Sequence, residues 1–291
     1  MNDTAYIAEK IAETLIKAGT TFRRDQTEAY RKALKKESSV HSRWVLEQIL
    51  SSSEIAEIKK LPLCDDTGIP HVVIEIGGNC PLPGGFLRAV EYGIEIGLRE
   101  LPGRPMAVLG SDEERISQSA GLSDNAGALL PAPFQIIRSY RPGIESDEVR
   151  VTVLMHGGGP EIRGKTLRIF HKHSSDVVEG EMISWATESA KLLGCQPCVF
   201  SFGIGRSNYE AAALSLQAMA FGEFGVQSPM ELRITEAVNK SGIGSLGLGG
   251  DITVLATFIR VGEQRASGVR VVSMRAGCCF DPRRADVTFK F

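Results

Sequence analysis

The spacing of apolar residues changes near residue 60, and this change limits the chain to a mixed architecture. Before it, apolar residues recur at helical intervals, as at Ile7, Ile11 and Leu15. After it, short β-branched runs alternate with segments of helix length. The pattern predicts an α+β (mixed α/β) fold, with a helical N-terminal region over residues 1–60. Residues 61–291 are expected to form a mixed β-sheet with packed helices in one continuous α/β domain.

Individual elements are predicted from the same patterns. Helices are expected at 25–36, 39–51, 84–100, 177–194, 207–221 and 229–240. Strands are expected at 71–78, 134–140, 149–156, 166–170, 198–205, 251–261 and 268–274. Between the helix ending at 100 and residue 128, frequent proline and glycine predict an irregular connector.

Charge and hydropathy exclude several classes of protein. A formal net charge of −2 gives no basic field of the kind that binds nucleic acid or an acidic membrane surface. No apolar run approaches the roughly 20 residues that cross a bilayer. The N-terminal segment 1–15 is amphipathic and carries carboxylates, unlike a signal peptide. We therefore expect a cytoplasmic protein with reduced cysteines.

Two glycine-rich stretches match nucleotide-binding patterns without their expected context. Residues 159–166 fit the phosphate loop G-x-x-x-x-G-K-[ST], which requires a helix to begin at its Lys-Thr pair. The segment that follows is β-branched and predicts a strand instead. Residues 242–247 fit G-x-G-x-x-G but follow a helix, whereas a dinucleotide site needs a preceding strand. A nucleotide-binding protein that uses Gly159–Thr166 remains one alternative.

Three cysteine neighbourhoods look like ligand loops. Cys64 precedes the polar loop Asp65-Asp66-Thr67-Gly68, Cys198 precedes a Gly-x-Gly turn, and Cys278-Cys279 follows a predicted strand. Thiolates from distant loops suit an iron–sulfur cluster. Taken alone, each cysteine is better explained as a small buried residue. A Cys₄ zinc site that includes Cys195, in a non-enzymatic scaffold, is a further alternative.

Six stretches, in this order, resemble the class I fumarases and the L-tartrate dehydratase alpha subunits. The resemblance extends from about residue 7 to about residue 285. Its segments are 42–68, 123–126, 156–161, 196–205, 241–250 and 279–284. In that family, three cysteines hold a [4Fe–4S] cluster and leave one iron without a protein ligand.

The resemblance implies the metal ligands and the reaction. The ligands would be Cys64, Cys198 and Cys279, with Cys278 as the alternative third ligand. The open iron would act as a Lewis acid on a hydroxyl group, which is otherwise a poor leaving group. The implied activity is that of a hydro-lyase, the reversible dehydration of a small hydroxy-dicarboxylic acid such as malate (to fumarate) or tartrate.

The resemblance also implies residues that act on the substrate. The catalytic residues would be Asp66 and Asp65, and the substrate-binding residues would be Arg104, His156, Gly157, Gly158 and Gly159. Some positions depart from the family pattern. Asp65 stands where the family usually has glutamine, and His156 precedes the triple glycine where the family has lysine.

A partner chain is implied as well. In the family, further substrate arginines and the proposed catalytic base lie in a beta subunit or in a C-terminal domain, and no stretch of this chain resembles that part. The chain is therefore expected to work with a separate beta subunit in a hetero- or homo-oligomer, on a small dicarboxylate substrate and not on nucleic acid or at a membrane.

Overall fold

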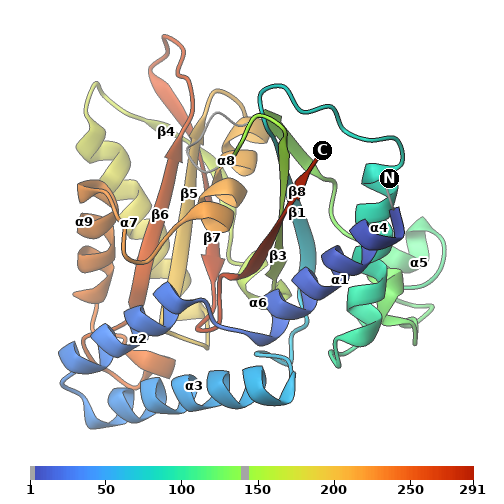
Figure 1. Cartoon of the computed structure of the whole chain (residues 1–291). Coiled ribbons are helices and arrows are strands. Elements are labelled where there is room, and N and C mark those ends of the chain that lie inside the picture. The colour runs from blue at the N-terminus through green and yellow to red at the C-terminus, as the bar shows by residue number, and fades with distance from the viewer. Residues whose placement is uncertain (1–3, 139–143) are drawn as a thin grey trace. The chain divides into compact units, whose positions relative to one another are not determined.

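The computed structural model describes residues 4–138 and 144–291, and the chain divides into two units that exchange segments. Unit 1 consists of Met1–Thr21, Ser53–His156 and Arg283–Phe291, and unit 2 consists of Phe22–Ser52 and Gly157–Pro282. Each unit contains one four-stranded mixed sheet (Figure 1). The units do not follow the predicted boundary at residue 60, because segments from both sides of it build each unit.

The sheet of unit 1 has the strand order β2-β1-β3-β8. Its strands are β1 (Ile69–Ile76), β2 (Gln135–Arg138), β3 (Glu148–His156) and β8 (Arg283–Lys290). β1 and β2 are parallel, whereas β1–β3 and β3–β8 are antiparallel. β8 is the last segment of the chain, yet it pairs with β3, so the chain returns to unit 1 to complete this sheet.

Two helices cover one face of this sheet, α1 (Thr4–Thr20) and α4 (Phe86–Glu100), which lie side by side in Figure 1. Their apolar stripes and the inward residues of the strands form one buried core. The helices pack closely at Gly93, where a Cβ atom would lie 2.5 Å from the carbonyl oxygen of Ala8 and 2.6 Å from the Cβ of Ile11. Unit 1 also contains α5 (Asp112–Ser117) and the 3-10 turn η1 (Ala126–Leu129).

The sheet of unit 2 has the order β4-β7-β5-β6, in which only β5 and β6 are parallel. Its strands are β4 (Lys165–Phe170), β5 (Cys198–Gly205), β6 (Val254–Val261) and β7 (Val269–Gly277). Every residue of β5 is buried. A strand that is apolar at nearly every position is typical of a sheet that is covered on both faces.

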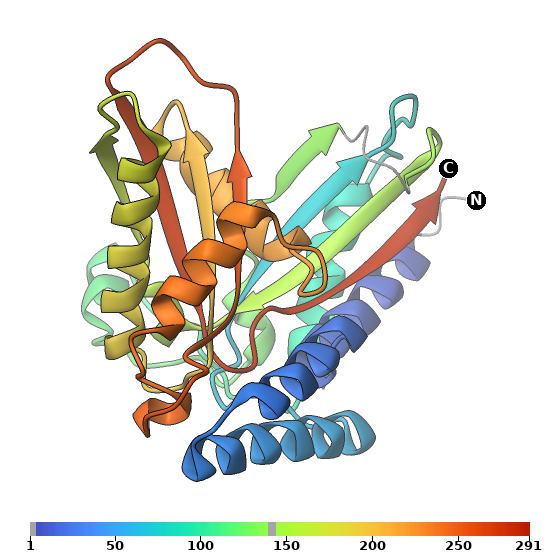
Figure 2. The same cartoon turned by 90° about the vertical axis from the view of Figure 1, so that its left-hand side faces the viewer.

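Helices α7 (Ser175–Leu192) and α9 (Pro229–Asn239) cover one face of this sheet, and α8 (Asn208–Phe221) covers the other. Unit 2 also contains α2 (Arg24–Lys36), α6 (Gly158–Glu161) and most of α3 (Val40–Lys59), which continues into unit 1. Phe200 and Phe202 of β5 pack with residues of α7 and α9, which lie together on one face in Figure 2. Gly203 points to the other face, where a Cβ atom would lie 2.1 Å from a backbone oxygen of α8.

The predicted α+β class is confirmed, and three of the differences between the observed and the predicted elements concern α3, α5 and β8. α3 continues to Lys59 instead of ending at 51. The connector contains α5, an exposed helix with a capping box formed by Ser111 and Glu114. β8 was not predicted, although Ala285, Val287 and Phe289 alternate as in a strand with one buried face.

The strand predicted at 134–140 is observed as β2, Gln135–Arg138. The last two positions of the predicted range, 139 and 140, lie outside the described residues. None of the helices in the described parts of the chain combines the length and the apolar character that a bilayer crossing requires.

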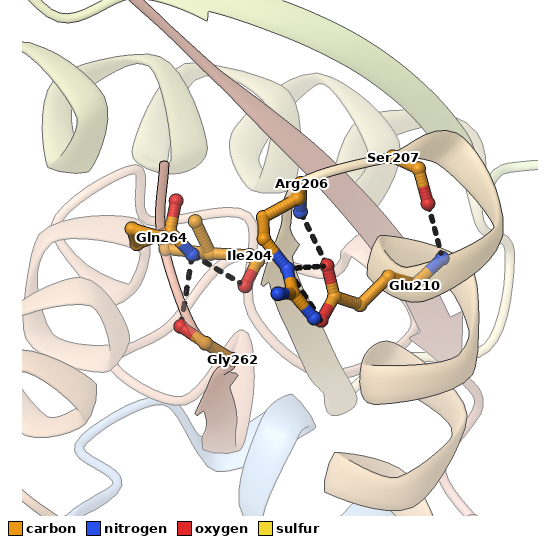
Figure 3. Close-up of polar contacts among 6 residues, drawn as sticks. All are labelled: Ile204, Arg206, Ser207, Glu210, Gly262 and Gln264. Atoms are coloured by element: carbon orange, nitrogen blue, oxygen red, sulfur yellow. Dashed lines mark hydrogen bonds and ion pairs between the residues drawn. The ribbon is translucent and has the colours of Figure 1, made fainter. Parts of the chain in front are cut away.

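The first turn of α8 carries a polar cluster that Figure 3 shows in detail. The side chain of Ser207 caps the helix by accepting a hydrogen bond from the amide of Glu210 (3.1 Å). The Glu210 carboxylate accepts hydrogen bonds from the guanidinium of Arg206 (2.7 Å) and from its main-chain amide (2.6 Å). Beside it, the side-chain amide of Gln264 donates to carbonyl oxygens of Ile204 and Gly262, at the ends of β5 and β6.

We predict that Gly93→Ala lowers the free energy of unfolding by about 1–3 kcal/mol, because the new methyl group would push α4 away from α1. The matched control is Gly180→Ala in α7, where a Cβ atom meets nothing within 4 Å. That control should raise the stability by up to about 1 kcal/mol through helix propensity. Urea unfolding followed by circular dichroism measures both, and equal effects of the two substitutions would contradict the packing argument.

We also predict a pH dependence from the α8 cluster. The side-chain and main-chain hydrogen bonds from Arg206 lower the pKa of Glu210 to about 2 from its usual 4.5. A carboxyl group with a depressed pKa stabilises the fold above its unfolded pKa, and this contribution disappears as the pH falls from about 4.5 towards 2. Glu210→Gln does not titrate, so its stability deficit relative to the wild type should shrink over that range. A deficit that stays constant between pH 6 and pH 3 in urea unfolding would show that the ion pair contributes nothing.

Candidate functional site

In unit 1, the candidate site is the loop between α3 and β1. The loop begins where the Leu63 amide donates to the carbonyl oxygen of Gly19 (2.9 Å). Cys64 follows and is half-buried. The next side chain, Asp65, is 89% exposed, and its carboxylate lies 3.9 Å from the guanidinium of Arg104. The structure therefore brings Cys64, Asp65 and Arg104 together at one end of the sheet of unit 1.

Asp66 and Gly68 form the turn that leads into β1. An oxygen of the Asp66 carboxylate accepts a hydrogen bond from the Gly68 amide (3.2 Å), as in an Asx turn. Gly68 has a φ of +84°, a conformation that other residues adopt only with strain. Between them, the Thr67 hydroxyl donates to the carbonyl oxygen of Arg104 (3.1 Å). One oxygen of Asp66 thus helps to shape the turn, whereas the carboxylate of Asp65 faces solvent.

The side chain of Arg283 binds the main chain of the same turn. Its guanidinium is buried and donates hydrogen bonds to the carbonyl oxygens of Asp66 (2.6 Å) and Thr67 (3.2 Å). The sequence indicated Arg283 only as part of a terminal C-x-x-x-R-R pattern, and no local signal revealed its contacts. The contacts arise because β8 pairs with β3 and brings Arg283 next to Met155, one residue before the end of β3.

His156 and the triple glycine occupy different environments. His156 ends β3 with an exposure of 1%, and its ring packs edge-on against His71 at 6.1 Å. A ring this enclosed presents almost no surface to a ligand. Gly157 belongs to unit 2, where it precedes the one-turn helix α6 that contains Gly158 and Gly159.

In unit 2, the candidate site is formed by Cys195, Cys198 and Cys279. Cys198 is the first residue of β5, and Cys279 follows the end of β7, the neighbouring strand. The Cys279 amide donates to the carbonyl oxygen of Cys195 (3.0 Å). Burial raises the pKa of the Cys198 thiol well above its usual value, and the nearby Cys195 and Cys279 raise it further. Cys198 therefore stays a neutral thiol unless a cation binds it.

The two adjacent cysteines differ in their contacts. The Cys278 amide donates to the carboxylate of Asp281 (2.8 Å), and the Cys278 sulfur accepts a hydrogen bond from the Phe280 amide (3.4 Å). The charge of Cys279 contributes to the raised pKa of the Cys198 thiol.

Side chains of helix α2 bind the main-chain carbonyl groups of the loop that contains Cys279. The hydroxyl of Tyr30 donates to the carbonyl oxygen of Cys279. The side-chain amide of Gln26 donates to the carbonyl oxygens of Phe280 (3.0 Å) and Asp281 (3.2 Å). Tyr30 and Gln26 are buried, and no pattern in the sequence indicated their contacts with the cysteine loop. The loop of Cys279 therefore resembles the loop of Cys64 in being held through its carbonyl groups.

The glycine-rich loop 241–250 lies against the Cys195–Cys198 segment. The Leu246 amide donates to the carbonyl oxygen of Gln196 (3.2 Å). The far end of this loop contacts two helices. The Ser42 hydroxyl of α3 donates to the carbonyl oxygen of Gly249 (2.6 Å). The buried carboxylate of Glu37, at the end of α2, accepts from the Ile252 amide (2.9 Å). The stretch with the dinucleotide pattern thus supports the cysteine segment and follows helix α9.

The alternative sites lack their required geometry. Lys165 and Thr166 open the strand β4, whereas a phosphate loop needs a helix at that point. Lys165 instead pairs with Glu188 on α7 (2.8 Å). Among the residues that the structure describes, no group of three or more histidine, cysteine or acidic side chains is spaced to hold a single metal ion. The alternative zinc site, which would consist of Cys195, Cys198, Cys278 and Cys279, is therefore not supported.

This chain is similar to known proteins over most of its length. A family model described as "Fumarate hydratase (Fumerase)" matches residues 8–288. A Methanocaldococcus jannaschii protein, provisionally named L(+)-tartrate dehydratase subunit alpha, is 29% identical over 283 residues, which is 94% of this chain and 93% of that protein. The L(+)-tartrate dehydratase subunit alpha of Escherichia coli K12 is 28% identical over 244 residues, 79% of this chain and 75% of its own length.

We predict that Tyr30→Phe destabilises unit 2, because it leaves the buried carbonyl group of Cys279 without its donor. The expected loss is about 1–3 kcal/mol of unfolding free energy. Tyr209→Phe is the matched control, since Tyr209 is 82% exposed. Urea unfolding followed by the fluorescence of Trp185 in unit 2 reports the effect, and a Tyr30→Phe protein as stable as Tyr209→Phe would contradict it.

Proposed function

This chain belongs to the Fumerase family of fumarate hydratases, and on that premise we propose that it is the alpha subunit of an iron–sulfur hydro-lyase. It would catalyse the reversible dehydration of a small hydroxy-dicarboxylic acid such as malate or tartrate, in the cytoplasm. The observation that carries the proposal is the pair of cysteine loops, each held through its main-chain carbonyl groups by buried donors.

The proposed ligands of a [4Fe–4S] cluster are Cys64, Cys198 and Cys279. Cys198 is fully buried with a raised pKa, and a buried thiol becomes a thiolate only when a cation such as iron compensates the charge. We assign Cys279 as the third ligand because its amide donates to the carbonyl oxygen of Cys195 and its charge raises the pKa of Cys198, with Cys278 as the alternative. When bound, such a cluster supplies an open iron that acts as a Lewis acid on the substrate hydroxyl.

Asp65 and Arg104 are the groups that we assign to the substrate. The exposed guanidinium of Arg104 would bind a substrate carboxylate, the partner that arginine matches best. The Asp65 carboxylate faces solvent and would accept or return a proton at the substrate carbon. One oxygen of the Asp66 carboxylate accepts the hydrogen bond from the Gly68 amide that shapes the turn. His156 is enclosed, so we assign it to the support of Gly68, whose Cβ position lies 3.0 Å from the His156 carbonyl oxygen. The amides of Gly157, Gly158 and Gly159 would approach the acid.

A beta subunit completes the proposal. Both relatives named above carry the words "subunit alpha", which implies a second kind of subunit in those enzymes. We propose that this chain likewise pairs with a beta subunit, which would supply the remaining substrate-binding groups, in a hetero-oligomer. Isolated from that partner, the chain should have little activity.

We predict that anaerobic reconstitution with iron and sulfide gives a brown protein with about four irons per chain. Serine at position 64, 198 or 279 should abolish the colour, because each change removes one thiolate. Cys80→Ser is the matched control, since Cys80 is buried in the core of unit 1. Cys278→Ser should keep the cluster. A colourless wild type, or a Cys64→Ser protein with full iron content, would refute the proposal.

A further inference from the structure

In unit 2, a cavity of about 430 Å³ lies at the carboxyl ends of the parallel strands β5 and β6. Two of its lining residues, Ile204 and Gln264, are drawn in Figure 3. This volume is within the roughly 300–1,000 Å³ of small-molecule sites, and ligands of open α/β sheets bind outside the carboxyl ends of the strands. Cys198 is the first residue of β5, and Ile204 lies near its other end. The cavity is therefore about 20 Å along the strand from the cysteine site.

The inner wall of the cavity is apolar. Val178 of α7, Ile204 of β5 and Met230 of α9 line it, and all three belong to the core of unit 2 or pack against it. Val178 and Ile204 are buried, whereas Val261 of β6, which also lines the cavity, is 60% exposed and marks its mouth. An apolar wall that opens to solvent in this way offers contact area to the non-polar part of a ligand.

The turn between β4 and α7 forms one side of the mouth, and its backbone is strained. Lys172 and His173 have φ angles of +49° and +56°, in the left-handed region that residues other than glycine rarely adopt. The Ser174 amide donates to the carbonyl oxygen of His171 (2.8 Å) and closes the turn. Strain of this kind persists only where the surrounding structure imposes it, and it is concentrated at functional sites.

His171 imposes this conformation on the turn. Its Nε2 donates to the carbonyl oxygen of Ser267 (2.7 Å), and its Nδ1 accepts from the His173 amide (2.9 Å). Both ring nitrogens of the buried His171 are therefore engaged. The ring of His173 packs edge-on against it, with 5.3 Å between the centroids, and is exposed where it lines the cavity. The turn thus places the imidazole of His173 at the mouth.

A guanidinium group and two helix ends face the same cavity. One terminal nitrogen of Arg270 donates to the carbonyl oxygens of Ser267 (3.3 Å) and Val269 (3.0 Å). In the part of the chain that the structure describes, the other N–H groups of this guanidinium have no partner. Helices α7 and α9 both begin at the cavity, which Ser175 and Met230 line from their first turns. The start of a helix favours negative charge.

The acidic side chains of these first turns do not oppose an anion in the cavity. They are Asp176 of α7 and Glu231 of α9, and neither is among the described residues that line it. The Glu231 carboxylate accepts from the Ser228 amide (2.6 Å) and the Ile259 amide (2.6 Å), one with each oxygen. The ionisable side chains among the described lining residues are Arg270 and two histidines, so the lining carries no negative charge.

We propose that this cavity is a second binding site, for a small carboxylate whose remaining part is apolar. The apolar wall holds the body of the ligand, and Arg270 binds the carboxylate at the mouth beside His173, because a guanidinium matches a carboxylate in geometry and charge. The site shares no residue with the cysteine site, and its ligand differs from a dicarboxylate, which is polar at both ends. The proposal therefore does not depend on an iron–sulfur cluster.

The first test titrates the full chain with octanoate and follows the NMR signals of isotope-labelled methionine methyl groups. The signal of Met230 should shift saturably, with a dissociation constant of about 1 mM or below for a ligand of this size. The signal of Met155, in the core of unit 1, should not move. Octanamide, which matches octanoate in size but has no charge, should bind at least about fivefold more weakly. Succinate, which has charge without an apolar body, should leave Met230 unchanged.

Two outcomes of this titration overturn the proposal. If the Met230 signal does not move with octanoate, the cavity is only a gap in the packing. If octanoate and octanamide bind equally well, the cavity does not recognise a carboxylate. Neither result bears on the proposed hydro-lyase function, because the titration uses the chain without a cluster.

Arg270→Gln tests the assigned partner of the carboxylate. It should weaken octanoate binding by about fivefold to hundredfold, because a charged hydrogen-bond donor is lost, and leave octanamide binding unchanged. The matched control is Arg168→Gln, an exposed arginine of β4. Arg168 pairs with Val271, the neighbour of Arg270, so its side chain points to the opposite face of the sheet. Equal octanoate affinities of the two variants would contradict the proposal.

A charge swap at the mouth covers the case in which Arg270→Gln does not fold, since Arg270 also binds main chain. Val261 is exposed, so Val261→Glu and Val261→Lys both leave the core intact. The glutamate should weaken octanoate binding by about threefold to tenfold relative to the lysine, by repulsion of the carboxylate. Octanamide should bind both variants alike. If octanoate also binds both alike, its carboxylate is not at this mouth and the inference is wrong.

Discussion

The cysteine loops depend on one constraint, which is that their buried main-chain carbonyl groups must find donors. An irregular loop cannot satisfy these groups with regular secondary structure, and leaving them unsatisfied costs about as much as the loss of a hydrogen bond. The donors come from distant parts of the sequence: Arg283 for the loop of Cys64, and Tyr30 with Gln26 for the loop of Cys279. Each is buried, so each contact acts where water cannot replace it.

This arrangement explains why the chain passes repeatedly between its two units. Helix α2 lies early in the sequence but serves the Cys279 loop near the end, and β8 lies last but completes the sheet that carries the Cys64 loop. The interleaved topology brings a donor to each loop without using the thiols. The thiol of Cys198, held neutral by burial, is thus available to a cation, in keeping with an enzyme of the fumarate hydratase family.

Much of the fold and part of the site followed from local patterns. The period of the apolar residues predicted α1, α4 and the buried strand β5, because each satisfies its own pattern without distant help. The same patterns missed β8, because the alternation of Ala285, Val287 and Phe289 is short and forms a strand only by pairing with β3. They also ended the prediction of α3 too early, at a run of serines that the observed helix includes. The motif identified the loop of Cys64, whereas Arg283 was noted only as part of the terminal C-x-x-x-R-R pattern and its contacts with that loop were not predicted.

The sequence by itself determined the α+β class, the family and the cysteine loops, because these depend on residue type and spacing along the chain. Only the tertiary structure decided that the Asp65 carboxylate faces solvent, that Cys198 is buried beside Cys195 and Cys279, and that His156 is enclosed. The physical reason is that burial, pairing and charge compensation depend on residues more than a hundred positions away, and no local pattern contains them.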